Sequence, residues 1–386
     1  MLYDPTAFEP LTDEPWDERR VRAGIQRIVS EAEQAFDPDR LWPANEWDAW
    51  QTPTPLKSLY VGAGGMVWAL DTLQRRGHAE TRLDLSAVAL RVLELWRAEP
   101  DLIEGIELPS KPASSLLIGE AGLLLVALRL APSAELADAL FARVRENIDN
   151  ETDELMWGSP GTMLAARAVH EWTGEERWAE AHRESAQALL DRREASGLWV
   201  QRLYGAQHRF LGPAHGLVGI VHALLPEDDL RRETAAILTD EAIVEDGFAT
   251  WPALAGGNLE PQEGGIRLQW CHGAPGMVGT AAEYLDEELL LAGAELTWRA
   301  GAHGSEKGVG LCHGTSGNGF PLLKTFARTG DERWLERARR FAVHALKQAE
   351  STPGRYSLFT GDIGAALFAS SCLNADARFP VLDGWD

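Results

Sequence analysis

The stretch Cys312-His313-Gly314-Thr315-Ser316-Gly317 places a thiol and an imidazole directly before two glycines that are separated by two residues. An apolar segment with helical spacing follows the second glycine. The same arrangement occurs at Cys271-His272-Gly273-Ala274-Pro275-Gly276, where the cysteine stands 41 residues before Cys312. Because the two stretches share one register, they indicate a repeating structural unit that carries chemistry in at least two copies.

The Gly-x-x-Gly step recurs through most of the chain at intervals of 39 to 58 residues, which leaves room for two helices per copy. The segments after the glycines are too apolar to face water, whereas the segments between copies are amphipathic and charged. We therefore predict an all-α protein, an α/α toroid of seven helical hairpins with Gly-x-x-Gly at the start of each inner helix. The glycine pairs are Gly62/Gly65, Gly119/Gly122, Gly158/Gly161, Gly216/Gly219, Gly273/Gly276, Gly314/Gly317 and Gly361/Gly364.

A second repeat supports the alternation of inner and outer helices. The hexapeptides at residues 173–178 and 329–334 are nearly identical, and each has the Thr-Gly sequence typical of a helix end. Strand patterns of period two are nearly absent. We expect residues 1–54 to form an N-terminal helix and loop within the same fold, and residues 55–386 to form the seven-repeat toroid with a central zinc site.

The charge and cysteine content exclude several classes of function. The 386 residues include 36 Lys plus Arg against 59 Asp plus Glu, a net charge of -23, which disfavours nucleic acid and anionic lipid as partners. No apolar run is long enough to predict a membrane span. Three cysteines cannot form a disulfide framework, and two of them adjoin histidines, so we expect a cytoplasmic protein that uses cysteine as a ligand.

The two Cys-His pairs suggest a metal centre. Thiolate sulfur and imidazole nitrogen are ligands that Zn²⁺ prefers, and Cys271, Cys312 and His313 would supply three of them and leave one position open, as in catalytic zinc sites. Packing of both cysteines in the core is the alternative. The third cysteine, Cys372, lies in an apolar segment without a neighbouring histidine and is assigned to the core.

The residue before the first glycine changes from copy to copy, and in three consecutive copies it is His215, His272 and His313. In a closed toroid these positions would surround a central cavity. We expect His215 to be a catalytic acid/base, held neutral near pH 7 by a helix N-terminus and the nearby zinc. His272 is a second catalytic candidate or a partner of the ligands. A polar residue that merely lines the cavity is the alternative for His215.

With these residues in view, the chain resembles the lanthionine synthetase C-like family, the relatives of the lantibiotic cyclases, over about residues 55 to 382. The matching sequences include residues 211–217, 270–276, 310–314 and 356–359. The resemblance implies an α/α toroid with a central zinc, held by Cys271, Cys312 and His313, and an acid/base at His215.

The resemblance also implies functions for other residues. Arg267 matches an active-site arginine of the cyclases, and Asp153 or Glu154 matches an acidic active-site residue in the third copy. Lys307 looks like a lysine that the stand-alone branch of the family uses near a phosphate. His272 also favours that branch, which is associated with glutathione and its addition to dehydroamino acids.

We therefore expect a zinc-dependent enzyme that adds a thiol, from a peptide cysteine or glutathione, to a dehydroalanine or dehydrobutyrine and forms a thioether. Its partners would be a dehydrated peptide or protein and the thiol. Two alternatives remain at this point. One is a non-catalytic sensor that binds zinc with glutathione or a peptide. The other is an α-toroid hydrolase, which requires a pair of catalytic carboxylates at the rim of the cavity.

Overall fold

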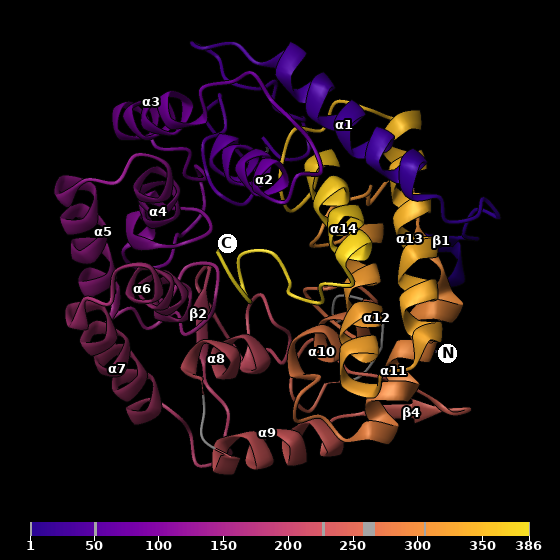
Figure 1. Cartoon of the computed structure of the whole chain (residues 1–386). Coiled ribbons are helices and arrows are strands. Elements are labelled where there is room, and N and C mark those ends of the chain that lie inside the picture. Colours follow the sequence, from indigo (N-terminus) through magenta and orange to yellow (C-terminus); the bar gives the residue numbers. More distant parts are fainter. Residues whose placement is uncertain (1, 50–51, 226–227, 258–266, 305, 386) are drawn as a thin grey trace.

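The computed structural model describes residues 2–49, 52–225, 228–257, 267–304 and 306–385. Within them the chain is mostly helical, and the helices form two concentric rings (Figure 1). The prediction of a helical ring is thus confirmed in outline.

The inner ring is made by helices that each begin directly after the first glycine of a Gly-x-x-Gly pair. At Gly273 the backbone has a φ of 84°, and an added Cβ would lie 2.0 Å from the carbonyl oxygen of Arg267, so only glycine fits this helix start. The inner helices are α2 (Ala63–Arg75), α4 (Glu120–Leu130), α6 (Ser159–Thr173), α8 (Leu217–Leu224), α10 (Ala274–Ala281), α12 (Thr315–Thr329) and α14 (Asp362–Asn374).

The outer ring is amphipathic, with one apolar face toward the inner helices. Its first member, α1, packs against α14 and α13, so the N-terminal helix takes the outer position beside the last inner helix (Figure 1). The outer helices are α1 (Glu18–Ala35), α3 (Leu85–Ala98), α5 (Ala134–Asn147), α7 (Glu176–Asp191), α9 (Asp228–Asp240), α11 (Glu287–Ala300) and α13 (Glu332–Ser351). Short 3-10 helices lie at Pro5–Ala7 and Pro112–Ser114.

Short strands depart from the all-α prediction. The structure contains β1 (Phe8–Glu9) paired with β6 (Ala302–His303), β2 (Gln201–Leu203) with β3 (Ala206–His208), and β4 (Ile243–Glu245) with β5 (Phe248–Thr250), all antiparallel. Two of these pairs close through Tyr204-Gly205 and Asp246-Gly247, in which both residues have positive φ. Two such residues form the tight turn that matches the strand twist, so very short hairpins are stable here.

The loops before the inner helices are hydrogen-bonded to one another. In each loop of this series, the bonded backbone groups belong to the residue two positions before the first glycine. The N–H of Cys271 donates to the carbonyl of Cys312 (3.4 Å), Cys312 to Phe359 (2.8 Å), Phe359 to Tyr60 (3.1 Å) and Tyr60 to Leu117 (2.9 Å). This chain of bonds shows that these helix N-termini meet at one end of the ring, and it fixes the backbone of both cysteines.

The C-terminal segment fills the centre of the ring (Figure 1). Phe379 stacks on Trp270, with 4.6 Å between ring centroids, and also packs against Phe320. The Leu382 carbonyl accepts hydrogen bonds from Arg167 and His222. The segment thus joins inner helices on opposite sides of the ring. None of the described helices is long and apolar enough to cross a membrane.

Candidate metal and catalytic site

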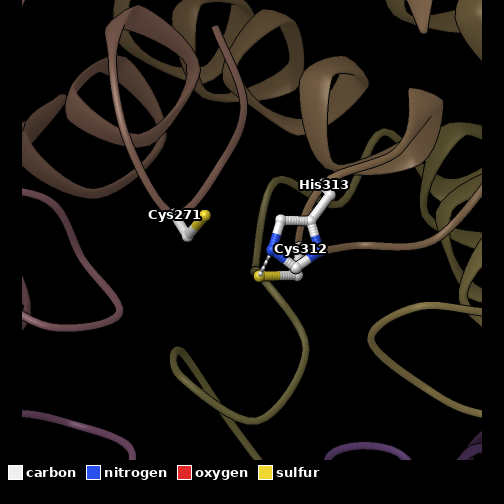
Figure 2. Close-up of side chains that lie close together, drawn as sticks. All are labelled: Cys271, Cys312 and His313. Atoms are coloured by element: carbon white, nitrogen blue, oxygen red, sulfur yellow. Dashed lines mark hydrogen bonds between the residues drawn. The ribbon is translucent and has the colours of Figure 1, made fainter. Parts of the chain in front are cut away.

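The three predicted ligands come together at the N-terminal end of the inner ring. One ligand atom from each of Cys271, Cys312 and His313 lies within 4.8 Å of the others, and the Cys312 Sγ is 3.6 Å from the His313 Nε2. Figure 2 shows that Cys271 comes from one loop and the adjacent Cys312 and His313 from the next. Both cysteines are buried, and His313 is half-buried.

Neighbouring side chains orient this cluster. The Gln269 amide donates a hydrogen bond to the Cys271 Sγ (2.9 Å), and the Tyr60 hydroxyl bonds to Cys312. The edge of the Trp47 ring packs against His313, with 5.7 Å between centroids. Each ligand therefore has a partner that restricts its orientation, as is usual around metal centres.

The two thiols influence each other's ionisation. Burial opposes the ionisation of Cys271, but the hydrogen bond from Cys312 and then the charge of His313 outweigh it and hold the pKa of Cys271 well below its usual range. Burial, and then the ionised Cys271, raises the pKa of Cys312. Two thiolates in one buried site therefore require a cation between them.

The donor set fits zinc. Zn–S bonds of about 2.3 Å and Zn–N bonds of about 2.0 Å in tetrahedral geometry place ligand atoms roughly 3.5 to 3.8 Å apart. The Cys312–His313 separation of 3.6 Å already meets this value. Three protein ligands leave the fourth position for a substrate atom, as in catalytic zinc sites.

His215 lies beside this cluster and contacts a buried carboxylate. Its Nδ1 is 2.7 Å from the Oε2 of Glu154, and its ring stacks near that of His272 at 6.3 Å between centroids. Glu154 is fully buried and also accepts hydrogen bonds from the backbone N–H groups of Met156 and Trp157. Since Nδ1 is engaged by the carboxylate, Nε2 is the nitrogen left for proton transfer.

The contact with Glu154 favours the protonated form of His215. Burial alone would lower the pKa of His215, but the hydrogen bond to Glu154 and the negative charge of its carboxylate outweigh burial and raise the pKa above its ordinary value. The expectation of an imidazole held neutral by a helix N-terminus and a nearby zinc did not include this carboxylate. A protonated His215 is a proton donor rather than a base.

The pKa of His272 is shifted in the opposite direction to that of His215. It is buried, and burial lowers its pKa to about 4. Its Nδ1 has no hydrogen-bond partner among the described residues. His272 therefore stays neutral at physiological pH, between Cys271 and His215.

The structure separates the two acidic candidates of the third copy. Asp153 is buried and forms an ion pair of 2.7 Å with Arg192 at the end of α7, whereas Glu154 contacts His215. Asp153 has a φ of 46°, in the left-handed region, so the chain turns between the two carboxylates. The geometry thus brings Glu154 to the site and directs Asp153 away from it.

The two predicted cations are exposed, and their charges act on different residues of the site. The positive charge of Arg267 reaches His215 and His272, whose pKa values it lowers. The charge of Lys307 acts on Cys312.

Sequence reasoning missed Tyr60, Gln269 and Trp47. Tyr60 stands two residues before the first glycine of its copy, the register of Cys271 and Cys312, so comparison of that register across copies would have found it. Gln269 lies two residues before a predicted ligand, and this closeness was its signal. Trp47 lies in a loop outside the repeat, and no sequence pattern identifies it as part of the site.

A cavity of about 1050 Å³ adjoins the cluster at Tyr60 and Trp47. Its wall includes Val61, Ile118 and Trp157, the residues that precede the first glycine in copies one to three. Apolar residues thus line the cavity opposite the histidines of copies four to six. A volume of this size accommodates a short peptide segment or a drug-sized molecule.

The carboxylates of this cavity are Glu46, Asp48 and Asp101, and no Lys or Arg is among its described lining residues. Asp48 is paired with Arg355 at 2.6 Å, and Asp101 accepts the backbone N–H of Lys57 at 2.7 Å. Two of the three carboxylates therefore have structural partners, which disfavours a hydrolase that works with a carboxylate pair.

Comparison with known proteins agrees with the architecture. The model of the family described as lanthionine synthetase C-like protein matches residues 19–383. Glutathione S-transferase LANCL1 of Danio rerio is 27% identical over 258 residues, 60% of this chain and 62% of the relative. LanC-like protein GCL1 of Arabidopsis thaliana is 30% identical over 205 residues, 47% of this chain and 44% of the relative. The chain thus spans less than two thirds of the length of each of these curated relatives.

Among solved structures, nisin cyclase superposes with a TM-score of 0.56 at 15% sequence identity, over 92% of this chain and 94% of that chain. The two proteins therefore share a fold. Together with the match over most of the chain, this confirms the resemblance noted in the sequence: the protein belongs to the lanthionine synthetase C-like family.

Proposed function

We propose that the protein adds a thiol to the β-carbon of a dehydroalanine or dehydrobutyrine and forms a thioether. The observation that carries this proposal is the juxtaposition of the Cys271–Cys312–His313 cluster with the His215–Glu154 pair. The first suits activation of a thiol, and the second suits delivery of a proton. Glutathione is the favoured small thiol, since a relative is named as a glutathione S-transferase.

Metal binding would supply the nucleophile. A free thiol with a pKa of about 8.5 is only about 3% ionised at pH 7, so a zinc ion that binds it as thiolate raises that population roughly 30-fold, or about 2 kcal/mol. Cys271, Cys312 and His313 would hold the ion. Gln269 and Tyr60 fix the sulfur atoms that bind it.

The addition balances without an oxidant or reductant. The thiolate sulfur forms a bond to the β-carbon as the carbon–carbon double bond breaks, and the electron pair moves to the carbonyl oxygen as an enolate. Arg267 stabilises that negative charge. His215 then transfers its Nε2 proton to the α-carbon, and the proton that the thiol lost restores the imidazolium.

Lys307 and Arg267 would orient an anionic group of the thiol substrate, such as a glutathione carboxylate, or a phosphate. The cavity would receive the acceptor. Because its wall is apolar and aromatic with acidic groups, we expect acceptors with apolar or basic residues beside the dehydroamino acid to react faster than acidic ones.

The direct test incubates the purified protein with glutathione and a dehydroalanine peptide and follows adducts by mass. Formation of several adducts per protein molecule, faster than in the uncatalysed mixture, supports an enzyme. Tight binding of glutathione or peptide without turnover would instead identify the sensor. A peptide whose mass decreases by hydrolysis would identify a hydrolase.

A further inference from the structure

The cavity beside the zinc ligands adjoins a second cavity at Tyr204. This outer cavity, of about 540 Å³, lies between the β2–β3 hairpin and the loops at residues 107–111 and 149–152. Tyr204 belongs to the walls of both cavities, and the chain at residues 101–111 also contributes to both. The two cavities therefore lie side by side and together lead from the metal cluster across Tyr204.

Tyr204 is fixed at the tip of the hairpin. It and Gly205 have φ values of 52° and 77°, as in the tight turns that close short hairpins. The Trp157 Nε1 donates a hydrogen bond to the Tyr204 hydroxyl at 3.0 Å, and the two rings meet edge to face at 6.5 Å between centroids. Yet 46% of Tyr204 is exposed. The ring is thus held in place and still available to a ligand.

The base of the same hairpin lies against the histidines of the site. Gln201 is buried, and its side-chain oxygen accepts the backbone N–H of Phe210 at 2.7 Å. The Phe210 ring packs near His215 and His272, at 5.9 and 5.6 Å between centroids. The hairpin therefore holds Tyr204 in a fixed position relative to the residues proposed to transfer the proton.

Exposed aromatic rings at a cavity indicate a surface that a ligand covers. The described side chains with large exposed apolar area include three aromatic rings, and two of them, Trp47 and Tyr204, line the cavity beside the zinc ligands. Tryptophan and tyrosine rings contribute much of the binding energy where proteins bind peptides, because a rigid ring buries a large area.

The charge along both cavities is negative. The outer cavity has the carboxylates of Glu107, Asp149 and Glu151 against the cations Lys111 and Arg202. The cavity beside the zinc ligands adds three carboxylates and has no Lys or Arg among its described lining residues. With a net charge of -23 on the whole chain, this surface attracts a basic peptide and repels an acidic one.

On the basis of the function proposed above, we propose that the acceptor is an extended basic peptide. Its dehydroamino acid lies at the metal cluster, the following part of the peptide crosses Tyr204, and a lysine or arginine lies in the outer cavity. The ring of Tyr204 is then a specificity-determining residue, which favours such a peptide over a short acceptor.

The test compares two acceptors in thioether formation with glutathione. One is a blocked dehydroalanine alone, and the other is a dehydroalanine peptide that continues for several residues on both sides and contains lysines. Tyr204→Ala removes the ring, whereas Tyr204→Phe keeps the ring and removes the hydrogen bond to Trp157. The matched control is Trp172→Ala, an exposed ring near the end of α6 that lines a different cavity.

We expect kcat/KM for the extended peptide to fall about threefold to tenfold in Tyr204→Ala, because an aromatic contact is lost. The blocked dehydroalanine should react equally well in this variant and in wild type, since it has no neighbouring residue to cover the ring. Tyr204→Phe and Trp172→Ala should match wild type with both acceptors. Acetylation of the peptide lysines should slow the reaction of wild type, and high salt should reduce that difference.

A binding measurement separates the peptide site from the reaction. The same peptide with alanine in place of dehydroalanine cannot react, and isothermal titration of the full chain should show one saturable site, weakened in Tyr204→Ala but not in Tyr204→Phe or Trp172→Ala. This pattern without adduct formation from any acceptor would support the peptide site and contradict the proposed reaction.

Three results would overturn the peptide site. One is the absence of saturable peptide binding to wild type. Another is an equal loss for the blocked and the extended acceptor in Tyr204→Ala, or an equal loss in Tyr204→Phe, which would mean that Tyr204 only supports Trp157. The third is an unchanged or faster reaction after acetylation of the lysines, which would exclude a preference for basic peptides.

Discussion

The two ends of the inner ring carry different side chains. Where the inner helices begin, the loops are hydrogen-bonded to one another and place buried thiols and imidazoles beside an apolar cavity with acidic groups. Where α2, α4 and α6 end, arginines gather around a cavity without carboxylates in its described wall. Backbone hydrogen bonds join the loops at the helix starts and fix the positions of the two cysteines, which suits a catalytic centre. The helix ends carry long cationic side chains, which form ion pairs with Asp71 and Asp376.

If the chemistry is confined to the helix starts, His215→Ala gives the largest loss of activity. Removal of a general acid costs about a hundredfold or more in kcat. Zinc content should be unchanged, because His215 is not among the three clustered ligands. The measurement is the rate of glutathione adduct formation together with metal analysis. A variant that retains both zinc and the full rate would remove His215 from the mechanism.

The substitution Glu154→Gln tests the electrostatics at the end of the ring where the inner helices begin, because it removes the carboxylate charge beside His215. Glu154 raises the pKa of His215, so the substitution lowers it. A general acid works only while protonated, so its contribution is present below its pKa and is lost as pH rises through that pKa. The high-pH decline of kcat should therefore move to lower pH in the variant.

Asp153→Asn is the matched control for the pH profile. Its carboxylate pairs with Arg192 and does not contact His215, so the profile should keep its position. The free energy of unfolding should fall by about 1 to 3 kcal/mol, because a buried ion pair loses one charge. Equal shifts of the two profiles would contradict the separate roles assigned to Asp153 and Glu154.

Trp47→Ala should have the smallest effect. Trp47 lines the cavity, packs against His313 and is stacked by Arg355 at 4.9 Å. Its removal should raise KM for an apolar acceptor peptide by about threefold to tenfold, with zinc content retained. Trp16, stacked by Arg339 at 5.1 Å away from the cavity, provides the matched control. A KM that changes equally in Trp16→Ala would mean that Trp47 acts through stability alone.

The glycine register explains how much could be predicted from the sequence. Because only glycine fits the tight helix starts, its spacing located the inner helices and placed Cys271, Cys312 and His313 in neighbouring loops. The side-chain direction of Glu154 depends on a left-handed turn at Asp153, which has no signal in the sequence. The hydrogen bond to Glu154 that raises the pKa of His215 could therefore not be predicted.

The arginine cavity could not be predicted either. Its residues range from Arg75 to Trp385 and share no motif, and they meet only because the helices run in parallel and the C-terminal segment returns to the centre of the ring. The short strand pairs were missed for a similar reason, since two of them are decided by a two-residue turn and the third joins segments far apart in the chain.

The measurement that tests the metal centre most directly is zinc content alongside adduct formation in Cys271→Ala and Cys372→Ala. Both cysteines are buried, but only Cys271 belongs to the cluster. We predict that wild type and Cys372→Ala hold about one zinc per chain, since three ligands and one open position form one tetrahedral site, and that both form the adduct. Cys271→Ala should lose the metal and the activity together. Full zinc occupancy and unchanged adduct formation in Cys271→Ala would contradict the proposed centre.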